Sequence, residues 1–203
     1  RVYVEAEVYE AFLGPIVAEA STVTVGPPAA ADADVGAITT EQQSERLEEH
    51  VRDAVRRGAR VLTGGHRLPG PGRFFAPTVL SDVDHSMMVM REETFGPVLP
   101  VMRVRDAGEA VRLANDSRYA LGADIWAERR VAERLVPRIR AGMANVNDCM
   151  YNGLLANLSF GGTGESGYGR VCGDEGLREM GRTQSVLVDR AGLRRDIGFY
   201  PLR

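Results

Sequence analysis

Residues 91–98, Arg-Glu-Glu-Thr-Phe-Gly-Pro-Val, place two adjacent carboxylates beside an aromatic side chain, a Gly-Pro turn and the start of a predicted strand. A carboxylate held at a strand entrance can accept hydrogen bonds from two neighbouring hydroxyl groups, as on a ribose. Phe95 could then pack flat on a ring. In the alternative interpretation, Glu92 and Glu93 are solvated and Phe95 is a core residue. The spacing alone favours that alternative, because Glu-Glu pairs are common.

A second unusual segment is the glycine-rich run at residues 160–170, which holds five glycines in eleven residues. So many glycines indicate tight backbone turns or the close approach of another chain segment. A loop that binds nucleotide phosphates would follow a strand and lead directly into a helix. The sequence predicts neither at this position, so we interpret the run as a structural loop.

The third candidate is Cys149, which follows a predicted strand at residues 143–147. Functional side chains often lie at strand ends in parallel sheets, so this thiol could act as a nucleophile. A cysteine without a neighbouring base is more often a small buried apolar residue, and the same holds for Cys172. The histidines form no metal-ligand pair, and His50 is expected on the exposed side of a helix.

The composition excludes several classes of function. The chain has 203 residues, a net charge of −3 and 25 basic residues, all of them arginine. The weak negative charge disfavours nucleic acid and anionic membranes as partners, and the lack of lysine excludes Schiff-base and P-loop lysine chemistry within these residues. No uncharged run approaches the ~20 apolar residues of a membrane span. Two cysteines without metal-site spacing indicate a reducing, cytoplasmic setting.

Strand-like and helix-like segments that could position these residues alternate along the chain. The pattern predicts strands at 2–4, 60–63, 74–80, 98–104, 123–126, 143–147 and 185–188. Helices are predicted at 7–21 with an interruption at Gly14-Pro15, after Thr40, after Asp106, at 128–141 with a kink at Pro137, and at 175–180. Strands separated by helices imply βαβ units, so we expect an α/β fold with a mainly parallel sheet flanked by helices.

The strongest predicted helix follows Thr40 and ends before Gly58. Thr40 and Gln43 form a capping-box pattern, in which the hydroxyl and the amide each satisfy a free backbone group. Gly58 can end the helix because it adopts the left-handed conformation without penalty. Helical spacing predicts a buried face made of Leu47, Val51, Ala54 and Val55.

In their order and spacing, several segments resemble the C-terminal half of the aldehyde dehydrogenase superfamily, over nearly the whole chain. The most specific motifs are Glu-Glu-Thr-Phe-Gly-Pro at 92–97, and Phe-Gly-Gly at 160–162 followed by Ser-Gly-Tyr-Gly-Arg at 166–170. Further matching pieces are Arg-Val-Tyr-Val at 1–4, Gly-Ala-Arg-Val-Leu-Thr-Gly-Gly at 58–65, Phe-Ala-Pro-Thr-Val-Leu at 75–80 and Val-Asn at 146–147.

The resemblance implies oxidation of an aldehyde to a carboxylic acid with NAD or NADP, through a cysteine thioester. By the same resemblance, Glu93 would bind the hydroxyls of the nicotinamide ribose, and Phe95 would pack at the nicotinamide end of the cofactor site. Asn147 would lie at the floor of the active site and Phe160 in the wall of the substrate tunnel. The strand at 185–188 would pair subunits, so a homo-oligomer is expected.

In the family, the nucleophilic cysteine and the general-base glutamate lie in segments that would precede residue 1, and Cys149 and Cys172 match neither. We therefore expect residues 1–184 to be a catalytic-domain portion without catalytic residues of its own, and residues 185–203 to be an oligomerisation strand and tail. The cofactor-binding domain is expected to be absent and the chain to be inactive alone. Two alternatives stay open: a non-catalytic oligomerisation or binding module derived from the family, and a different activity built on Cys149.

Overall fold

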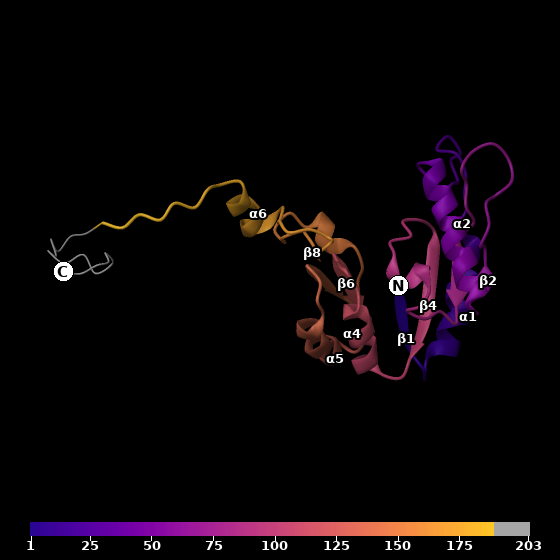
Figure 1. Ribbon diagram of the computed structural model, residues 1–203, viewed down its shortest axis with the longest axis horizontal. Helices are drawn as coiled ribbons and strands as arrows, with labels where there is room; N and C mark the ends of the chain where they lie inside the picture. The colour runs from indigo at the N-terminus through magenta and orange to yellow at the C-terminus, as the bar shows by residue number, and fades with distance from the viewer. Residues whose placement is uncertain (189–203) are drawn as a thin grey trace, which may run out of the picture.

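The computed structural model describes residues 1–188 and contains a four-stranded sheet (Figure 1). Its strands lie in the order β1-β4-β3-β2, and their bounds are Val2–Glu5 for β1, Val98–Val104 for β4, Thr78–Ser81 for β3 and Arg60–Thr63 for β2. β1 and β3 run parallel to β4, whereas β2 pairs antiparallel with β3 at one edge. The predicted α/β fold with a mainly parallel sheet is therefore confirmed.

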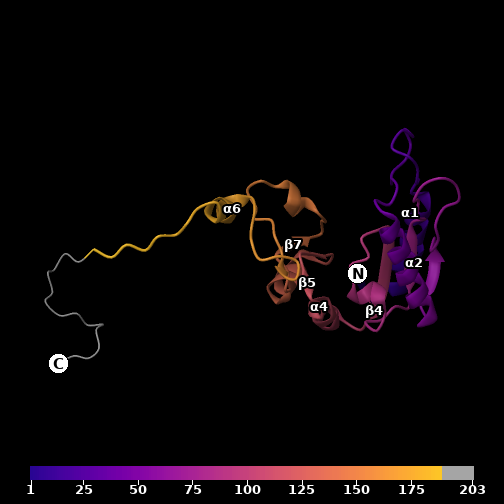
Figure 2. The ribbon, with the colours of Figure 1, turned by 45° about the horizontal axis from the view of Figure 1, so that its top comes forward.

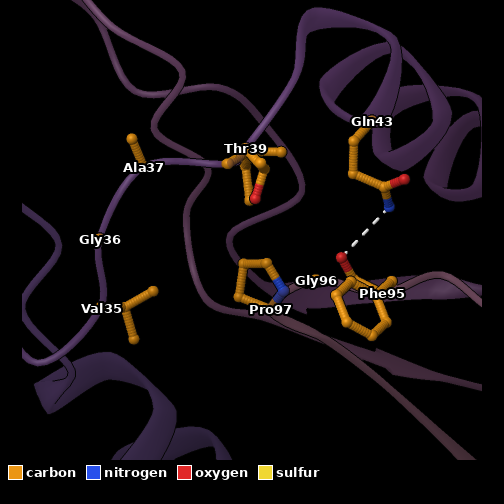
Figure 3. A pocket seen from close by; sticks show the side chains of 9 residues that line it. Val35, Gly36, Ala37, Thr39, Gln43, Phe95, Gly96 and Pro97 are labelled. Carbon is orange, nitrogen blue, oxygen red and sulfur yellow. Dashed lines mark hydrogen bonds between the residues drawn. The ribbon is translucent and has the colours of Figure 1, made fainter.

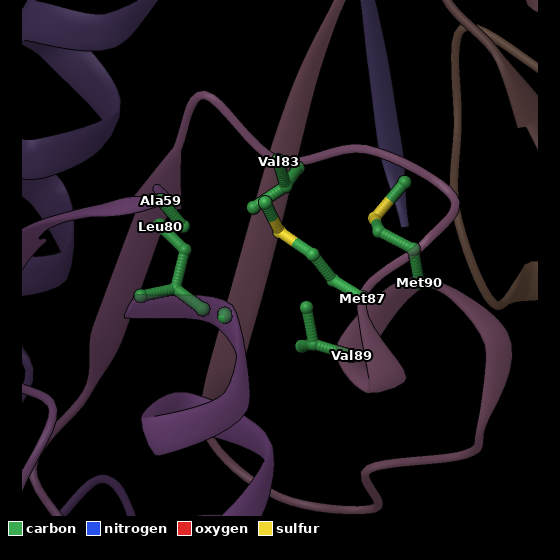
Figure 4. Packing of buried hydrophobic residues seen from close by; sticks show 7 residues of the cluster. Ala59, Leu80, Val83, Met87, Val89 and Met90 are labelled. Atoms are coloured by element: carbon green, nitrogen blue, oxygen red, sulfur yellow. The ribbon is translucent and has the colours of Figure 1, made fainter. Parts of the chain in front are cut away.

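Helices cover both faces of this sheet. Successive strand residues point to opposite faces, so Val79 and Leu80 of β3 belong to two different hydrophobic clusters. Helix α1 (Tyr9–Thr22) packs on the Val79 face, and α2 (Glu41–Arg56) with the short α3 (Met88–Arg91) packs on the Leu80 face. Figure 4 shows the cluster on the Leu80 face, with Ala59, Leu80, Val83, Met87, Val89 and Met90.

Helix α1 runs without a break through Gly14 and Pro15, so the predicted interruption was wrong. A proline inside a helix removes one backbone donor and crowds the preceding turn. Apolar side chains on both sides of the proline, including Phe12, Ile16 and Val17, pack in one cluster on the sheet. Their burial offsets the local cost and keeps the helix continuous.

Helices α2 and α4 (Ala107–Asn115) begin at the caps that the sequence predicts. The Thr40 hydroxyl oxygen accepts a hydrogen bond from the Gln43 backbone N–H at 3.2 Å, and the Asp106 carboxylate accepts one from the Glu109 N–H at 2.8 Å. The reciprocal half of the Thr40 capping box is not formed, because the Gln43 amide donates to a neighbouring loop instead.

Strand β3 is shorter than the strand predicted at 74–80, because it begins only after Pro77. Proline has no N–H to donate to the ladder, so regular pairing starts at the next residue. Phe75 forms only an isolated bridge with Arg67.

A smaller part of the structure follows α4 along the chain (Figures 1 and 2). Its main pair is parallel and joins β6 (Gly122–Ile125) to β7 (Met143–Val146) through α5 (Arg129–Leu135). A second, antiparallel pair joins β5 (Tyr119–Ala120) to β8 (Thr163–Gly164). The remaining elements are two 3-10 helices, at Val136–Arg138 and Tyr151–Leu154, and α6 at Gly173–Glu179.

The helix predicted at 128–141 ends at Leu135, and a single 3-10 turn containing Pro137 follows it. The proline therefore ends the α-helix rather than kinking it, since its ring blocks the next helical hydrogen bond.

The two parts meet where β1, the edge strand, faces α4 (Figures 1 and 2). The Tyr3 hydroxyl shares a 2.9 Å hydrogen bond with His85 Nε2 and donates to the Leu113 carbonyl at 3.3 Å. His85 Nδ1 lies 3.1 Å from the Asp116 carboxylate. Residues from three elements or their connections thus form one polar chain across the junction.

The strand predicted at 185–188 is not formed in the described residues, which are exposed and pair with no other segment there. A strand requires a neighbour for its backbone N–H and C=O groups. Residues 189–203, the rest of the predicted tail, lie outside the described residues.

Of the helices in residues 1–188, none is both long and apolar enough to cross a membrane. The same residues hold no group of three His, Cys, Asp or Glu side chains arranged for a metal ion.

Candidate functional site

The loop between α3 and β4 separates the roles of its two adjacent carboxylates. Glu92 forms a hydrogen-bonded ion pair with Arg118. Glu93 is exposed, and its carboxylate has no hydrogen-bond or ion-pair partner among residues 1–188. The second carboxylate therefore retains all of its acceptor capacity for another molecule, whereas the first is already engaged.

Phe95, on the same loop, is 75% exposed and is not a core residue, contrary to the alternative interpretation. Its backbone has φ of 46°, a left-handed conformation that non-glycine residues rarely adopt. Such a conformation persists only where the surroundings enforce it. The loop thus presents a carboxylate and an aromatic ring to the outside, one residue apart.

Side chains on one face of α2 contact the loop at 92–97. Gln43 donates from Nε2 to the carbonyls of Thr94 and Phe95, the latter at 3.2 Å (Figure 3). One turn further on, Leu47 lies so close to Gly96 that a Cβ there would come within 2.5 Å of the leucine side chain. After about two turns, His50 shares a 3.1 Å hydrogen bond with the Thr94 hydroxyl.

His50 is buried, with 1% of its surface exposed, so its predicted position on the exposed side was wrong. Its spacing from Leu47 and Ala54 places it on the same helical face as the apolar residues. Burial lowers the pKa of His50, and the positive charge of Arg46 lowers it further. The ring is therefore neutral at pH 7 and keeps one donor and one acceptor nitrogen.

An open cavity of about 370 Å³ adjoins Phe95 and the start of β4 (Figure 3). Phe95, Gly96 and Pro97 form one wall, Gln43 lies at the start of α2, and residues 35–39 form the opposite wall. The lining is mostly apolar, with the Gln43 amide and the Thr39 hydroxyl as polar groups. Such a lining suits the flat face and the edge groups of a ring system.

Arg118 connects the loop at 92–97 with the glycine-rich segment. Its guanidinium pairs with Glu92 and lies 3.3 Å from the Glu165 carboxylate. Its backbone carbonyl accepts a hydrogen bond from the Glu165 N–H at 3.0 Å. The side chain also stacks over the Tyr119 ring, 4.7 Å from the ring centre. Two segments far apart in sequence are thereby joined by one side chain.

The glycines at 160–170 serve close backbone packing. A Cβ on Gly142, the residue before β7, would lie 1.8 Å from the Gly161 carbonyl oxygen, so no side chain fits between these two backbone segments. Arg170 donates to the carbonyls of Gly162 and Gly169 at 2.7 and 2.8 Å and fills the remaining space. These contacts agree with a structural loop.

Asn147 lies directly after β7 with its side chain bound to the end of the neighbouring strand. The amide donates to the Ala127 carbonyl at 2.9 Å and accepts from the Ala127 N–H at 3.0 Å. The residue has φ of 54°. Its side chain therefore fixes the carboxyl ends of β6 and β7 relative to each other.

Phe160 is half-buried at the start of the glycine-rich segment and forms a two-sided backbone bridge with Val171. Its ring lies against Gly153 of the second 3-10 helix. No hydrogen bond or ion pair within residues 1–188 joins Asn147 or Phe160 directly to Glu93 or Phe95. Glu93 and Phe95 share one loop, whereas Asn147 follows β7 and Phe160 begins the glycine-rich segment, so the structure does not join the four predicted residues in one contact network. Arg118 links the loop at 92–97 to the glycine-rich segment through Glu92 and Glu165.

Both cysteines are exposed, so the interpretation of Cys149 and Cys172 as buried apolar residues was wrong. Neither sulfur has a hydrogen-bond partner among the described residues. A cysteine nucleophile needs a nearby base or positive charge to form the thiolate. Within residues 1–188, no hydrogen bond joins either thiol to such a group.

Sequence reasoning missed three residues of this region: Gln43, His50 and Arg118. Helical spacing offered a signal for His50, because it lies between Leu47 and Ala54 on the buried face. Gln43 carried a signal for a cap only, and Arg118 carried none, since its partners are distant in sequence.

The family model described as "Aldehyde dehydrogenase family" matches residues 1–186. The chain is 38% identical over 202 residues to 4,4'-diapolycopene aldehyde oxidase of Methylomonas sp, covering 99% of the chain and 37% of that protein. It is 35% identical to a succinate-semialdehyde dehydrogenase [NADP(+)] 1 of Mycobacterium ulcerans, covering 93% of the chain and 41% of that protein. The chain thus spans about two fifths of the length of these relatives.

Among solved structures, an aldehyde dehydrogenase of Mycobacterium tuberculosis complexed with NAD+ superposes with a TM-score of 0.87 at 31% identity. That match covers 94% of the chain and 40% of the other protein. A betaine aldehyde dehydrogenase of Staphylococcus aureus in complex with NAD+ superposes with a TM-score of 0.81 at 31% identity, over 88% of the chain and 36% of the other protein.

Proposed function

The chain belongs to the aldehyde dehydrogenase family, and from this premise we propose that it is part of an enzyme that oxidises an aldehyde to a carboxylic acid with NAD or NADP. One observation carries the proposal. The loop at 92–97 presents a Glu93 carboxylate that has no partner within residues 1–188, and an exposed Phe95 ring, next to an open, mostly apolar cavity.

The residues of this loop fit a nucleoside. An ionised carboxylate accepts charge-assisted hydrogen bonds, and both of its oxygens can bind the two hydroxyls of a ribose. Phe95 offers a flat apolar surface for an attached ring. In this proposal, Glu93 binds the nicotinamide ribose and Phe95 packs at the nicotinamide end. The bound cofactor supplies the hydride acceptor, and the loop restricts where its ring can lie.

We assign the aldehyde pocket to the smaller part of the structure. Asn147, at the carboxyl ends of β6 and β7, would lie at the pocket floor, and the half-buried Phe160 would form part of its wall. Because the Asn147 amide is bonded to the Ala127 backbone, its role would be to support the floor rather than to bind the substrate. These positions agree with the usual place of ligands at the carboxyl ends of parallel strands.

The covalent step, attack of a cysteine thiolate on the aldehyde and later release by water, is proposed to use a nucleophile and a base from outside residues 1–203. Cys149 and Cys172 are free and exposed, and neither thiol is hydrogen-bonded to a base among the described residues. We therefore propose that residues 1–184 are a catalytic-domain portion that is inactive without those groups. Residues 185–203 would form the oligomerisation strand and tail of a homo-oligomer.

Nucleotide binding by matched carboxylate variants tests the proposal. NAD+ and NADP+ are each titrated into the full natural polypeptide and into its Glu93→Gln variant. We expect the affinity for the bound nucleotide to fall at least about tenfold in Glu93→Gln, because a hydrogen bond to a charged acceptor becomes a neutral one.

Glu92→Gln is the matched control, since it changes the same residue type one position earlier. Its carboxylate already pairs with Arg118, so the affinity should change less than about threefold. Equal losses in the two variants, or a larger loss in Glu92→Gln, would contradict the assignment of Glu93.

A further inference from the structure

We propose that His50 of α2 is a positioning residue that fixes Glu93 and Phe95 in their outward orientation by binding Thr94. This inference rests on the proposed function, because it assumes that these two residues contact the cofactor. His50 touches neither of them through its side-chain hydrogen bond, and acts through the residue that lies between them.

Thr94 is anchored from two sides. Its hydroxyl shares the 3.1 Å hydrogen bond with His50 Nδ1, and its carbonyl accepts a hydrogen bond from Gln43. With both groups bound to α2, Thr94 is half-buried against this helix, while the side chains on either side of it remain outside the contact. The exposure of both Glu93 and Phe95 agrees with this arrangement.

His50 is well suited to hold a fixed position. It lies in the middle of a continuous 16-residue helix, and only 1% of its surface is exposed. A buried ring nitrogen that lost its partner would pay the cost of desolvation, so the bond to Thr94 is favoured over a bond to water. The left-handed backbone of Phe95 also needs such an anchor nearby.

Two substitutions each remove one partner of the hydrogen bond between His50 and Thr94. Thr94→Val replaces the hydroxyl with a methyl group of similar size, and His50→Phe keeps a ring but removes the nitrogen. His50→Asn is the conservative variant, because its amide can reach the place of Nδ1. Ser44→Ala is the control: Ser44 is equally buried on α2, and its hydroxyl bonds only to the Thr40 carbonyl among the described residues.

The measurements are amide hydrogen exchange of residues 92–96 and the affinity for NAD+ and NADP+, in the full natural polypeptide. We expect Thr94→Val and His50→Phe to exchange faster in this loop and to bind nucleotide about three- to tenfold more weakly. His50→Asn should restore both values to near those of the unmodified protein. Ser44→Ala should leave both unchanged, even if it lowers the melting temperature.

The inference is overturned if Thr94→Val and Ser44→Ala behave alike, or if His50→Asn is as impaired as His50→Phe. Failure of the proposed function gives a different result. In that case, either the unmodified protein binds neither nucleotide, or the Glu93→Gln variant binds nucleotide as tightly as the unmodified protein. Hydrogen exchange of the loop in the His50 and Thr94 variants would still show whether His50 holds the loop.

Discussion

Individual residues in this protein are defined by what they bind more than by their type. Glu92 and Glu93 are chemically identical neighbours, yet one is paired with Arg118 and the other has no partner among residues 1–188. His50 and His66 differ in the same way, since His50 is buried against a threonine and His66 lies exposed in a loop. Their chemical roles therefore follow from local contacts.

The burial of His50 predicts a pH dependence of stability. Its pKa is lowered in the folded state, mainly by burial, so the unfolded chain binds a proton more readily. The corresponding stability is present above the ordinary histidine pKa of about 6.5 and is lost as the pH falls below it. Arg46 adds to the lowering, while Glu49, Glu92 and Asp53 oppose it.

We expect the free energy of unfolding of the natural polypeptide to fall between about pH 7.5 and 5.5, and to fall less in His50→Asn. Urea unfolding at both pH values measures this. The carboxylates titrate alike in the two proteins, so their difference isolates the histidine. An identical pH dependence in both proteins would contradict a lowered pKa of His50 in the folded state.

At the scale of elements, α2 joins the core to the functional loop. Its first half binds Thr94 and Phe95 through Gln43, and its second half packs Ala54 into the hydrophobic cluster that contains Leu80. Near its end, the buried Asp53 carboxylate accepts hydrogen bonds from Arg57 at 2.9 Å and from the Met88 backbone N–H at 2.8 Å. Asp53 thereby fixes the start of α3, the helix that leads into the loop.

Loss of this carboxylate should destabilise the protein. In Asp53→Ala, the Met88 N–H loses its acceptor and Arg57 loses its partner, so we expect a loss of about 2 kcal/mol in the free energy of unfolding. Urea unfolding measures it. Glu49→Ala, an exposed change on the same helix, should cost less than about 0.5 kcal/mol. Similar values for both would argue against a capping role for Asp53.

At the scale of the whole molecule, the part that follows α4 exposes many large apolar side chains. They include Trp126, Leu154, Tyr168, Leu177, Val186 and Leu187. Apolar surface of this extent is typical of a face that is covered by another protein segment. The extended residues 185–188 also present unpaired backbone groups, which a strand of a second subunit could satisfy.

We expect a proline in this segment to weaken self-association. Consecutive N–H groups point to opposite edges of a strand, so either Val186→Pro or Leu187→Pro must remove a donor that faces the partner. One of the two should shift the natural polypeptide toward monomer, as measured by light scattering after size-exclusion chromatography. Val186→Ala and Leu187→Ala are the controls for the lost side chains. Unchanged mass in both proline variants would argue against pairing through this strand.

The sequence by itself determined the fold class, the helix caps and the positions of the two specific motifs. These features depend on local chemistry: helical and strand periodicity, Thr40 and Asp106 as N-caps, and Gly-rich segments that match a family pattern. It also indicated Glu93 rather than Glu92 as the carboxylate that binds the ribose, but only through the resemblance to the family. Its errors at Pro15, Pro137 and Phe75 are boundary errors, where packing or a missing N–H decides how far an element extends.

Only the tertiary structure decided which side chains meet. It buried His50 against Thr94, turned the Gln43 amide from its own cap toward the loop, and joined Glu92 to Glu165 through Arg118. Each of these contacts joins residues that are more than 20 positions apart in the sequence. No local rule, such as helical spacing or capping, therefore predicts them. Free energy minimised over the whole chain selects such partners, because each buried polar group must find an acceptor or donor within reach.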